Sequence, residues 1–199
     1  PIFPSKNGFG LFVNNIPVTQ ADIPAANGVI HKVAAVLMPP SQYLWDRINT
    51  YPNLTYLKAA IQRADSGSTA ATSLQAALQN PAANLTIFAP TNTAFQQTLT
   101  GQITLALMPQ GMDQATATAT ATVLASSPTV FQNPALYSVL TAQVVQGIIV
   151  YHILGNRAFT VNLPTTATYH PTLLNTVISS HPGGSLKATF VVTGATAAK

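Results

Sequence analysis

The amino-acid sequence predicts an α+β fold, with strands near both ends of the chain and helices between them. Three observations lead to this prediction. Residues 9–37 contain short apolar runs separated by Asn and Gly turn signals, a pattern typical of β-hairpins. Residues 41–67 and 133–152 carry apolar residues at helical spacing. Residues 186–192 alternate between two sets of side chains, as a β-strand does.

The N-terminal region predicts two hairpins. An Asn-Asn pair at positions 14–15 separates the apolar runs 10–13 and 16–18, and Asn tolerates the positive φ angles of a tight turn. A second turn at residues 26–28 leads into another apolar strand. Two prolines at positions 39–40 then end the strand region and form a short, stiff connection.

The central region predicts helices. A helical region begins at Ser41, Pro52 fits the first turn of the next helix, and Gly67 ends its pattern. After Asn133, which is followed by a proline, a further helix is expected. Its apolar residues recur at every fourth position: Leu136, Leu140, Val144 and Ile148.

Two shorter segments complete the expected elements. Residues 84–89 alternate as a strand, and Thr91 or Asn92 can cap the helix that follows. Residues 115–122 are a strict Ala-Thr alternation, for which two interpretations stay open. One is a loop or a short polar helix, and the other is a glycosylated or strand-forming segment.

The composition excludes several classes of protein. Charged residues make up 6% of the 199 residues, against about 25% in a typical soluble domain. The formal net charge is +4, but the cations are scattered, and nucleic-acid binding needs clustered Lys and Arg. Cys is absent, which excludes disulfides and cysteine-based zinc sites. No apolar run reaches the roughly 18 residues of a transmembrane helix. A surface rich in Thr, Ser, Asn and Gln is typical of extracellular and fibrous proteins.

The sequence predicts no catalytic site, no metal site and no cofactor. Nucleophilic catalysis needs a Ser or Thr beside a His that a carboxylate orients. The chain has no Gly-x-Ser-x-Gly motif, and no acidic residue follows Asp113. The acids are not placed as a carboxylate pair for glycoside chemistry would require: Asp22, Asp46, Asp65 and Asp113. The histidines are too dispersed to indicate a metal site: His31, His152, His170 and His181.

Three segments resemble the fasciclin domain family. Residues 85–95 read LTIFAPTNTAF and resemble the first signature of the family. Residues 150–155 read VYHILG and resemble its second signature. Residues 21–39, with ADI, NGVIH and VLMP in this order, resemble the strands that close a fasciclin domain. The resemblance implies a fasciclin-like fold, in which twisted β-sheets form a wedge or sandwich with helices.

The order of these segments differs from the order in the family, because the closing strands come first. The sequence is therefore interpreted as a closing-strand segment, residues 1–40, and a domain body, residues 41–199, without closing strands of its own. Each apolar side chain of the first segment is worth roughly 1.5–3 kcal/mol when buried. Together they exceed the net stability of a typical domain, about 5–15 kcal/mol. A body without such strands should therefore be unstable.

Three sources of the closing strands stay open: the segment folds back on its own chain, it completes a neighbouring subunit, or it belongs to a tandem array. The connector from Leu37 to Gln42 spans at most about 18 Å, and its prolines keep it straight, which favours donation to a neighbouring subunit. The expected donation interface combines residues from both segments: Leu11, Phe12, Val13, Ile16, Val18, Val29, Ile30, Val33, Leu37, Leu186, Ala188, Phe190 and Val192.

The resemblance also implies a set of structural and adhesion residues. Tyr151 and His152 are expected near the first signature, with the His152 imidazole hydrogen-bonded to Thr91 or Asn92. In animal members of the family, the corresponding pair takes part in integrin-type adhesion. Another adhesion motif of the family is resembled by Asp22 and Ile23.

The sequence therefore predicts a non-enzymatic adhesion or structural protein that lies outside the cell or at its surface. It is expected to be a subunit of a filament or surface fibre that assembles head-to-tail with its own copies by strand donation. Other cell-surface proteins or glycans are further candidate partners. The alternative is a monomeric fasciclin-like module for cell adhesion or for binding an apolar ligand, since some members of the family bind apolar pigments.

Overall fold

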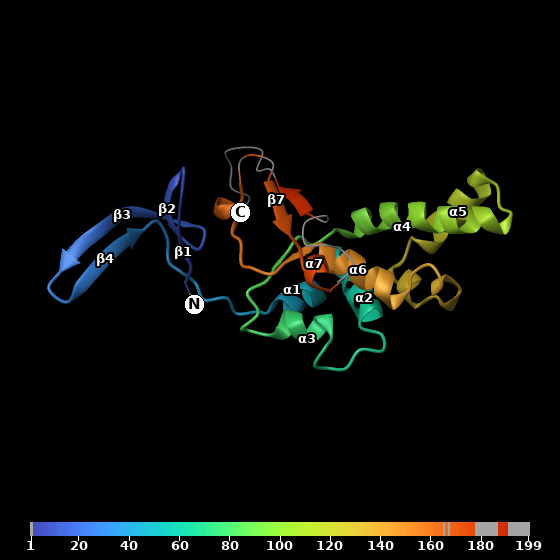
Figure 1. The fold of residues 1–199 in the computed structure, drawn as a ribbon, viewed down its shortest axis with the longest axis horizontal. Coiled ribbons are helices and arrows are strands. Elements are labelled where there is room, and N and C mark those ends of the chain that lie inside the picture. The colour runs from blue at the N-terminus through green and yellow to red at the C-terminus, as the bar shows by residue number, and fades with distance from the viewer. Residues whose placement is uncertain (1, 165, 167, 178–186, 191–199) are drawn as a thin grey trace. The chain divides into compact units, whose positions relative to one another are not determined.

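A computed structural model describes residues 2–164, 166, 168–177 and 187–190, and its mixture of helices and strands confirms the α+β class (Figure 1). The chain divides into two compact units. The first, called the strand unit, comprises residues 1–41, 156–170 and 187–199. The second, called the helical unit, comprises residues 42–155 and 171–186. Each unit is described by itself.

A four-stranded antiparallel sheet dominates the strand unit (Figure 1). Its strands follow one another in chain order: β1 (Pro4–Asn7), β2 (Gly10–Val13), β3 (Ile16–Ala25) and β4 (Gly28–Val33). Asn14 has a φ of 58° in the turn between β2 and β3, which confirms the hairpin predicted from the Asn-Asn pair. The second predicted hairpin is also confirmed, because Ala25 pairs with Gly28 across its turn.

The longest pairing of this sheet, between β3 and β4, is interrupted twice. Val18 pairs with Val33, Gln20 with Lys32 and Ile23 with Ile30, so the register shifts before and after Gln20. Asp22 lies within the second irregularity and has a φ of 56°. Positive φ is uncommon for a residue other than glycine, although Asp tolerates it better than most. β3 is therefore bulged where it carries Asp22.

Residues 157–161 of the strand unit contact Phe3 and Asn7 near the start of the chain. The Arg157 guanidinium lies over the Phe3 ring, 4.4 Å from its centroid, and the Phe159 ring is tilted against the Phe3 ring with a centroid distance of 6.2 Å. Asn7 donates a hydrogen bond from its side-chain amide to the Val161 carbonyl oxygen in the 3₁₀ turn η5 (Thr160–Asn162). Farther along, β7 (Thr168–Pro171) and β8 (Lys187–Phe190) form a two-stranded sheet.

The helical unit contains helices, 3₁₀ turns and one short sheet. Its elements in chain order are α1 (Leu44–Thr50), η1 (Pro52–Leu54), α2 (Thr55–Ala64), α3 (Leu74–Gln79), β5 (Thr86–Ile87), α4 (Asn92–Leu107), η2 (Met108–Gln110), α5 (Gln114–Leu124), η3 (Pro128–Gln132), η4 (Pro134–Leu136), α6 (Ala142–Tyr151), β6 (Ile153–Leu154) and α7 (Leu174–Val177). The predicted helix after Pro52 and the strand within residues 84–89 are thereby confirmed.

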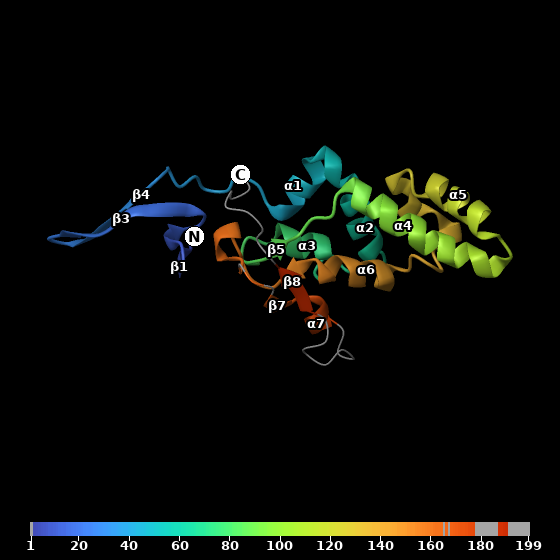
Figure 2. The same cartoon turned by 90° about the horizontal axis from the view of Figure 1, so that it is seen from above.

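Helix α2 forms the centre of the core, where it packs against α4, α6 and η3 (Figure 2). Leu57 and Ile61 of α2 are completely buried, as are Ile103 of α4 and Ile149 of α6. The Phe95 ring of α4 is a further buried member of this core. A hydrophobic core therefore exists within the helical unit, built mainly by helices.

Two features of α6 differ from the prediction. Leu136 belongs to η4, and Leu140 precedes α6. Helix α6 begins after Thr141, because the Thr141 hydroxyl caps it by accepting a hydrogen bond from the Val144 N–H. Val144 is exposed, whereas the next residue, Val145, is buried. The spacing of four thus spans a 3₁₀ turn and a helix, and the buried face of α6 is displaced by one residue at that point.

Helix α5 covers the Ala-Thr alternation and so confirms the helical interpretation. Ala117 and Ala121 are completely buried and face α4, where small side chains allow the two helices to approach closely. The exposed Thr118 hydroxyl donates a hydrogen bond to the Gln114 carbonyl oxygen at 2.7 Å. Such bonds one turn back satisfy the hydroxyls within the helix.

Asp113 caps α5. Its carboxylate accepts hydrogen bonds from the Ala115 and Thr116 N–H groups at 3.0 and 3.1 Å, and from the Thr116 hydroxyl at 2.6 Å. The hydroxyl bond from Thr116 is the main reason that the pKa of Asp113 lies below its ordinary value of 3.8. The backbone N–H bonds act in the same direction.

Acidification is expected to loosen the first turn of α5. Because the pKa of Asp113 is lower in the folded chain, its stabilising effect is full above the ordinary value of 3.8 and is lost as the pH falls through the folded-state value. NMR-detected protection of the Ala115 and Thr116 amides should therefore decline in acid. Asp113→Asn keeps an acceptor that does not titrate, so an equal decline in this variant would contradict the prediction.

Candidate functional site

The two signature segments come together in the helical unit through the sheet of β5 and β6. Thr86 pairs with Leu154 and Ile87 with Ile153, in antiparallel orientation. The pairing continues beyond the strands, because the Phe88 N–H donates to the His152 carbonyl oxygen at 2.9 Å. The segments that carry the fasciclin resemblance therefore lie side by side, although they are far apart in the sequence.

Thr91 and Asn92 both organise helix N-termini. The Thr91 hydroxyl accepts a hydrogen bond from the Ala94 N–H at 3.3 Å, so Thr91 is the cap of α4, one of the two residues predicted for this role. The Asn92 side chain accepts from the Tyr56 N–H at 3.2 Å and donates to the Pro52 carbonyl oxygen at 3.1 Å. Asn92 thus joins the start of α4 to the segment that begins α2.

His152 follows α6, and its hydrogen bond differs from the predicted one. Its Nδ1 lies 2.8 Å from the Ile148 carbonyl oxygen, one turn back. Because a carbonyl oxygen accepts, Nδ1 carries the hydrogen. The expected bond to Thr91 or Asn92 is wrong, because the last turn of a helix leaves carbonyl oxygens without partners within the helix and the imidazole uses one of them.

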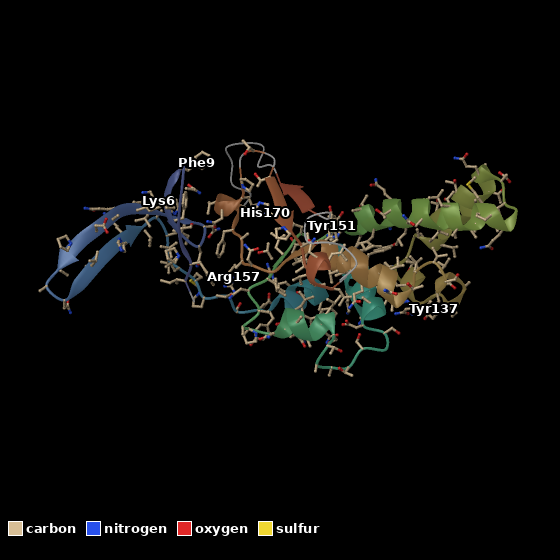
Figure 3. The ribbon with its side chains drawn as sticks, viewed as in Figure 1. Lys6, Phe9, Tyr137, Tyr151, Arg157 and His170 are labelled. Atoms are coloured by element: carbon tan, nitrogen blue, oxygen red, sulfur yellow. The ribbon has the colours of Figure 1, made fainter. Side chains whose placement is uncertain are left out.

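Tyr151 and His152 are half-buried, and their rings meet edge to face with centroids 5.9 Å apart (Figure 3 labels Tyr151). The neighbouring aliphatic residues belong mainly to the core, since Ile149, Ile153 and Leu154 are at most 2% exposed. These aliphatic side chains therefore stabilise the helical unit and do not form an accessible adhesive surface.

This site shows packing and capping contacts more than reactive chemistry. The His152 Nδ1–H is engaged by a backbone carbonyl, and Thr91 and Asn92 are engaged by helix starts. Within residues 2–164, 166, 168–177 and 187–190, no group of three or more His, Asp or Glu side chains is arranged to hold a metal ion. These contacts hold α4, α6 and the β5–β6 sheet together at their junction.

Asp22 and Ile23, the other expected adhesion residues, lie in the strand unit, at the bulge of β3. The Asp22 side chain is 85% exposed. Its backbone N–H donates to Nδ1 of His31 on β4 at 3.2 Å, and its carboxylate lies 3.9 Å from the same nitrogen. The sequence pattern did not indicate the link between Asp22 and His31. The hairpin turn at residues 26–28 indicated that the two strands pair, but the bulges hid the register.

The apolar residues of β2–β4 that are expected at the donation interface, together with Leu37, are exposed or half-buried. Val29 and Ile30 of β4 are 59% and 57% exposed, and Leu11 of β2 is 39% exposed. The others are half-buried: Phe12, Val13, Ile16, Val18, Val33 and Leu37.

The predicted counterpart of these strands, residues 186–192, is only partly described. Ala188 and Phe190 belong to β8, whose backbone pairs with β7, whereas β1–β4 pair among themselves. Leu186 and Val192 lie outside the described residues.

Comparison with known proteins bears on the strand unit. The model of the fasciclin domain matches residues 3–39, the region that contains β1–β4. No curated protein matches the chain. In the part of the chain that the structure describes, no helix has both the length and the apolar character needed to cross a membrane. Residues 3–39 are therefore similar to part of a fasciclin domain.

Proposed function

We propose that this chain is a non-enzymatic extracellular adhesion or structural subunit, and that its β3–β4 hairpin completes the helical unit of a second copy. Fasciclin domains are generally adhesion modules without catalytic activity and are usually extracellular, and residues 3–39 match this class. The observation that carries the proposal is that the hairpin exposes apolar side chains of a segment typical of the interior of a fasciclin domain.

The position of β4 supports this assignment. In the order β1-β2-β3-β4, β4 is an edge strand, and edge strands are the usual places where another chain adds to a sheet. Val29 and Ile30 lie in β4 and point to opposite faces of the strand, and both are more than half exposed. Burial of each such side chain contributes roughly 1.5–3 kcal/mol.

The chemistry of the strands favours a protein partner. β3 and β4 together carry three charged or titratable side chains, Asp22, His31 and Lys32, and the rest of the hairpin is apolar or uncharged. A segment that pairs through backbone hydrogen bonds and inserts aliphatic side chains fits an incomplete sheet and a hydrophobic core.

Donation in one direction predicts filaments. The donor surface, β3–β4, differs from the acceptor surface, the helical unit, so the contact is heterologous. A heterologous contact leaves one unused donor and one unused acceptor at the ends of each oligomer, and it propagates unless the geometry closes a ring. The copies would then be arranged head-to-tail.

Sedimentation of the full chain over a wide concentration range tests the proposal. The wild type should form species much larger than the monomer of 20.8 kDa. Replacing both Val29 and Ile30 by Ser should shift the protein to the monomer, because it removes the apolar side chains that are exposed on β4. Val123→Ser is the matched control, since Val123 is 72% exposed on α5 and its replacement should leave the polymers intact.

Three results would overturn the proposal. One is a wild type that stays at 20.8 kDa at high concentration, which would favour the monomeric adhesion or apolar-ligand module. The second is polymerisation that survives the double substitution. The third is equal loss of polymers in Val123→Ser, which would indicate general apolar association instead of strand donation.

A further inference from the structure

The bulge of β3 contains a backbone N–H with an unusual acceptor. The register shift between Gln20 and Ile23 means that more residues of β3 than of β4 occupy this stretch. A bulge disrupts the ladder locally, so a backbone N–H within it needs another partner. Asp22 N–H finds this partner in the His31 side chain, with 3.2 Å between its nitrogen and Nδ1.

This bond requires a neutral His31. A ring nitrogen that accepts a hydrogen bond carries no hydrogen, so in this arrangement the ring hydrogen is on Nε2. A protonated imidazole has hydrogen on both ring nitrogens and accepts no such bond. Protonation of His31 and the Asp22 N–H bond are therefore mutually exclusive.

A second partner lies beside the same nitrogen. Oδ1 of Asp22 is 3.9 Å from Nδ1 of His31, which is beyond an ordinary hydrogen bond but close enough for an ion pair once the ring is charged. One residue, Asp22, thus offers His31 a donor through its backbone and an acceptor through its carboxylate. Which of them His31 engages depends on whether Nδ1 carries a hydrogen.

No other charged side chain of β3 or β4 faces His31. β4 is hydrogen-bonded to β3, and the charged residue of β3 is Asp22. On β4 itself, Lys32 is the other charged residue and pairs with Gln20 on the opposite face of the strand. The His31 side chain is 50% exposed, so protons reach it from solvent.

We propose that Asp22 and His31 form a pH-operated switch that sets the shape of the β3 bulge. In the neutral form, His31 accepts from the Asp22 N–H and holds the backbone of Asp22 at positive φ. In the protonated form, His31 donates to the Asp22 carboxylate, and the N–H is released to solvent. Imidazole is the side chain whose ordinary charge change falls between about pH 5 and 8.

The switch has a consequence for assembly that rests on the proposed function. The bulge separates the pair Val18–Val33 from the pair Ile23–Ile30, so its shape sets how these apolar pairs are aligned along the hairpin. If the hairpin is inserted into a second copy, protonation of His31 changes the surface that is inserted. The extent of polymerisation should then depend on His31 across this pH range.

NMR titration of the full chain tests the switch directly. The Val29→Ser, Ile30→Ser background keeps the protein monomeric under the proposed function, and the titration runs from about pH 8 to pH 5. The Asp22 amide signal should shift with the same midpoint as the His31 ring signals. The His152 ring is an internal control, since its Nδ1–H donates to Ile148 and its titration should leave the Asp22 amide unaffected.

Two variants separate the two partners of His31. His31→Gln keeps an acceptor that does not titrate, so the Asp22 amide shift should lose its pH dependence. Asp22→Asn keeps the backbone N–H but removes the carboxylate charge, so the Asp22 amide signal should still shift with pH, because the neutral His31 ring can still accept from it. An Asp22 amide that does not follow His31, or that shifts equally in His31→Gln, would overturn the switch.

Sedimentation of the wild type and of His31→Gln at both ends of the pH range forms the second arm. A His31-linked amide shift with no polymers at either pH would support the switch and contradict the proposed function. Polymers without the linked amide shift would contradict the switch alone. Polymers whose extent changes with pH in the wild type but not in His31→Gln would support both.

Discussion

Replacement of Ile61 by Ala is expected to lower the free energy of unfolding by about 2–5 kcal/mol. Ile61 is completely buried in α2, at the centre of the helical core, so the substitution removes buried methyl groups and leaves a cavity. Urea denaturation followed by circular dichroism measures the loss as a lower transition midpoint. The wild type and the variant should be compared at a protein concentration low enough to exclude polymers.

Ile30→Ala is the matched control, because it makes the same chemical change in the strand unit. Ile30 is 57% exposed, and a surface substitution changes stability by no more than about 0.5 kcal/mol. An equally large loss in Ile30→Ala would show that Ile30 is buried within the single chain, and it would contradict the argument for donation. A small loss in Ile61→Ala would show that the helical core is not formed as described.

Phe95→Ala is expected to cost about 3–5 kcal/mol. The Phe95 ring stacks on Tyr56 at a centroid distance of 6.3 Å and meets Phe131 edge to face at 5.9 Å. It therefore joins α4 to α2 and η3, and its removal disrupts three elements at once. Thermal unfolding monitored by the near-ultraviolet signal of the aromatic residues would show this loss as a lower midpoint.

Phe9→Ala serves as the control for the aromatic substitution. Phe9, labelled in Figure 3, is 78% exposed in the turn between β1 and β2. Its replacement should leave the midpoint nearly unchanged, because little contact is lost. If Phe95→Ala were tolerated equally well, the aromatic cluster of Tyr56, Phe95 and Phe131 would not be the link between these elements.

Much of the fold follows from local sequence signals. The hairpins β2–β3 and β3–β4 and helix α2 were predicted, because turn residues and helix-ending residues act over a few positions. Asn14 and Gly67 both adopt positive φ, at 58° and 87°. The start of α6 was misplaced because a spacing of four suits both a helix and a 3₁₀ turn followed by a helix. In this case the cap at Thr141 decides where the helix begins.

The candidate site was predicted less completely. The resemblance led to the expectation that the two signatures meet, but the acceptor of His152 is a backbone carbonyl, which no side-chain pattern indicates. The contact between Asp22 and His31 depends on a register with two irregularities, and alternation alone gives a regular register. Val29 and Ile30 are more than half exposed, and sequence periodicity carries no information about what would cover them.

The double hydrogen bond of Asn92 has a consequence for cooperativity. Asn92 lies at the beginning of one helix and holds the Tyr56 N–H and the Pro52 carbonyl oxygen at the beginning of another. Helix termini normally fray. With a single amide group bridging them, unravelling of either terminus removes a restraint on the other, so that both behave as one unit of local opening.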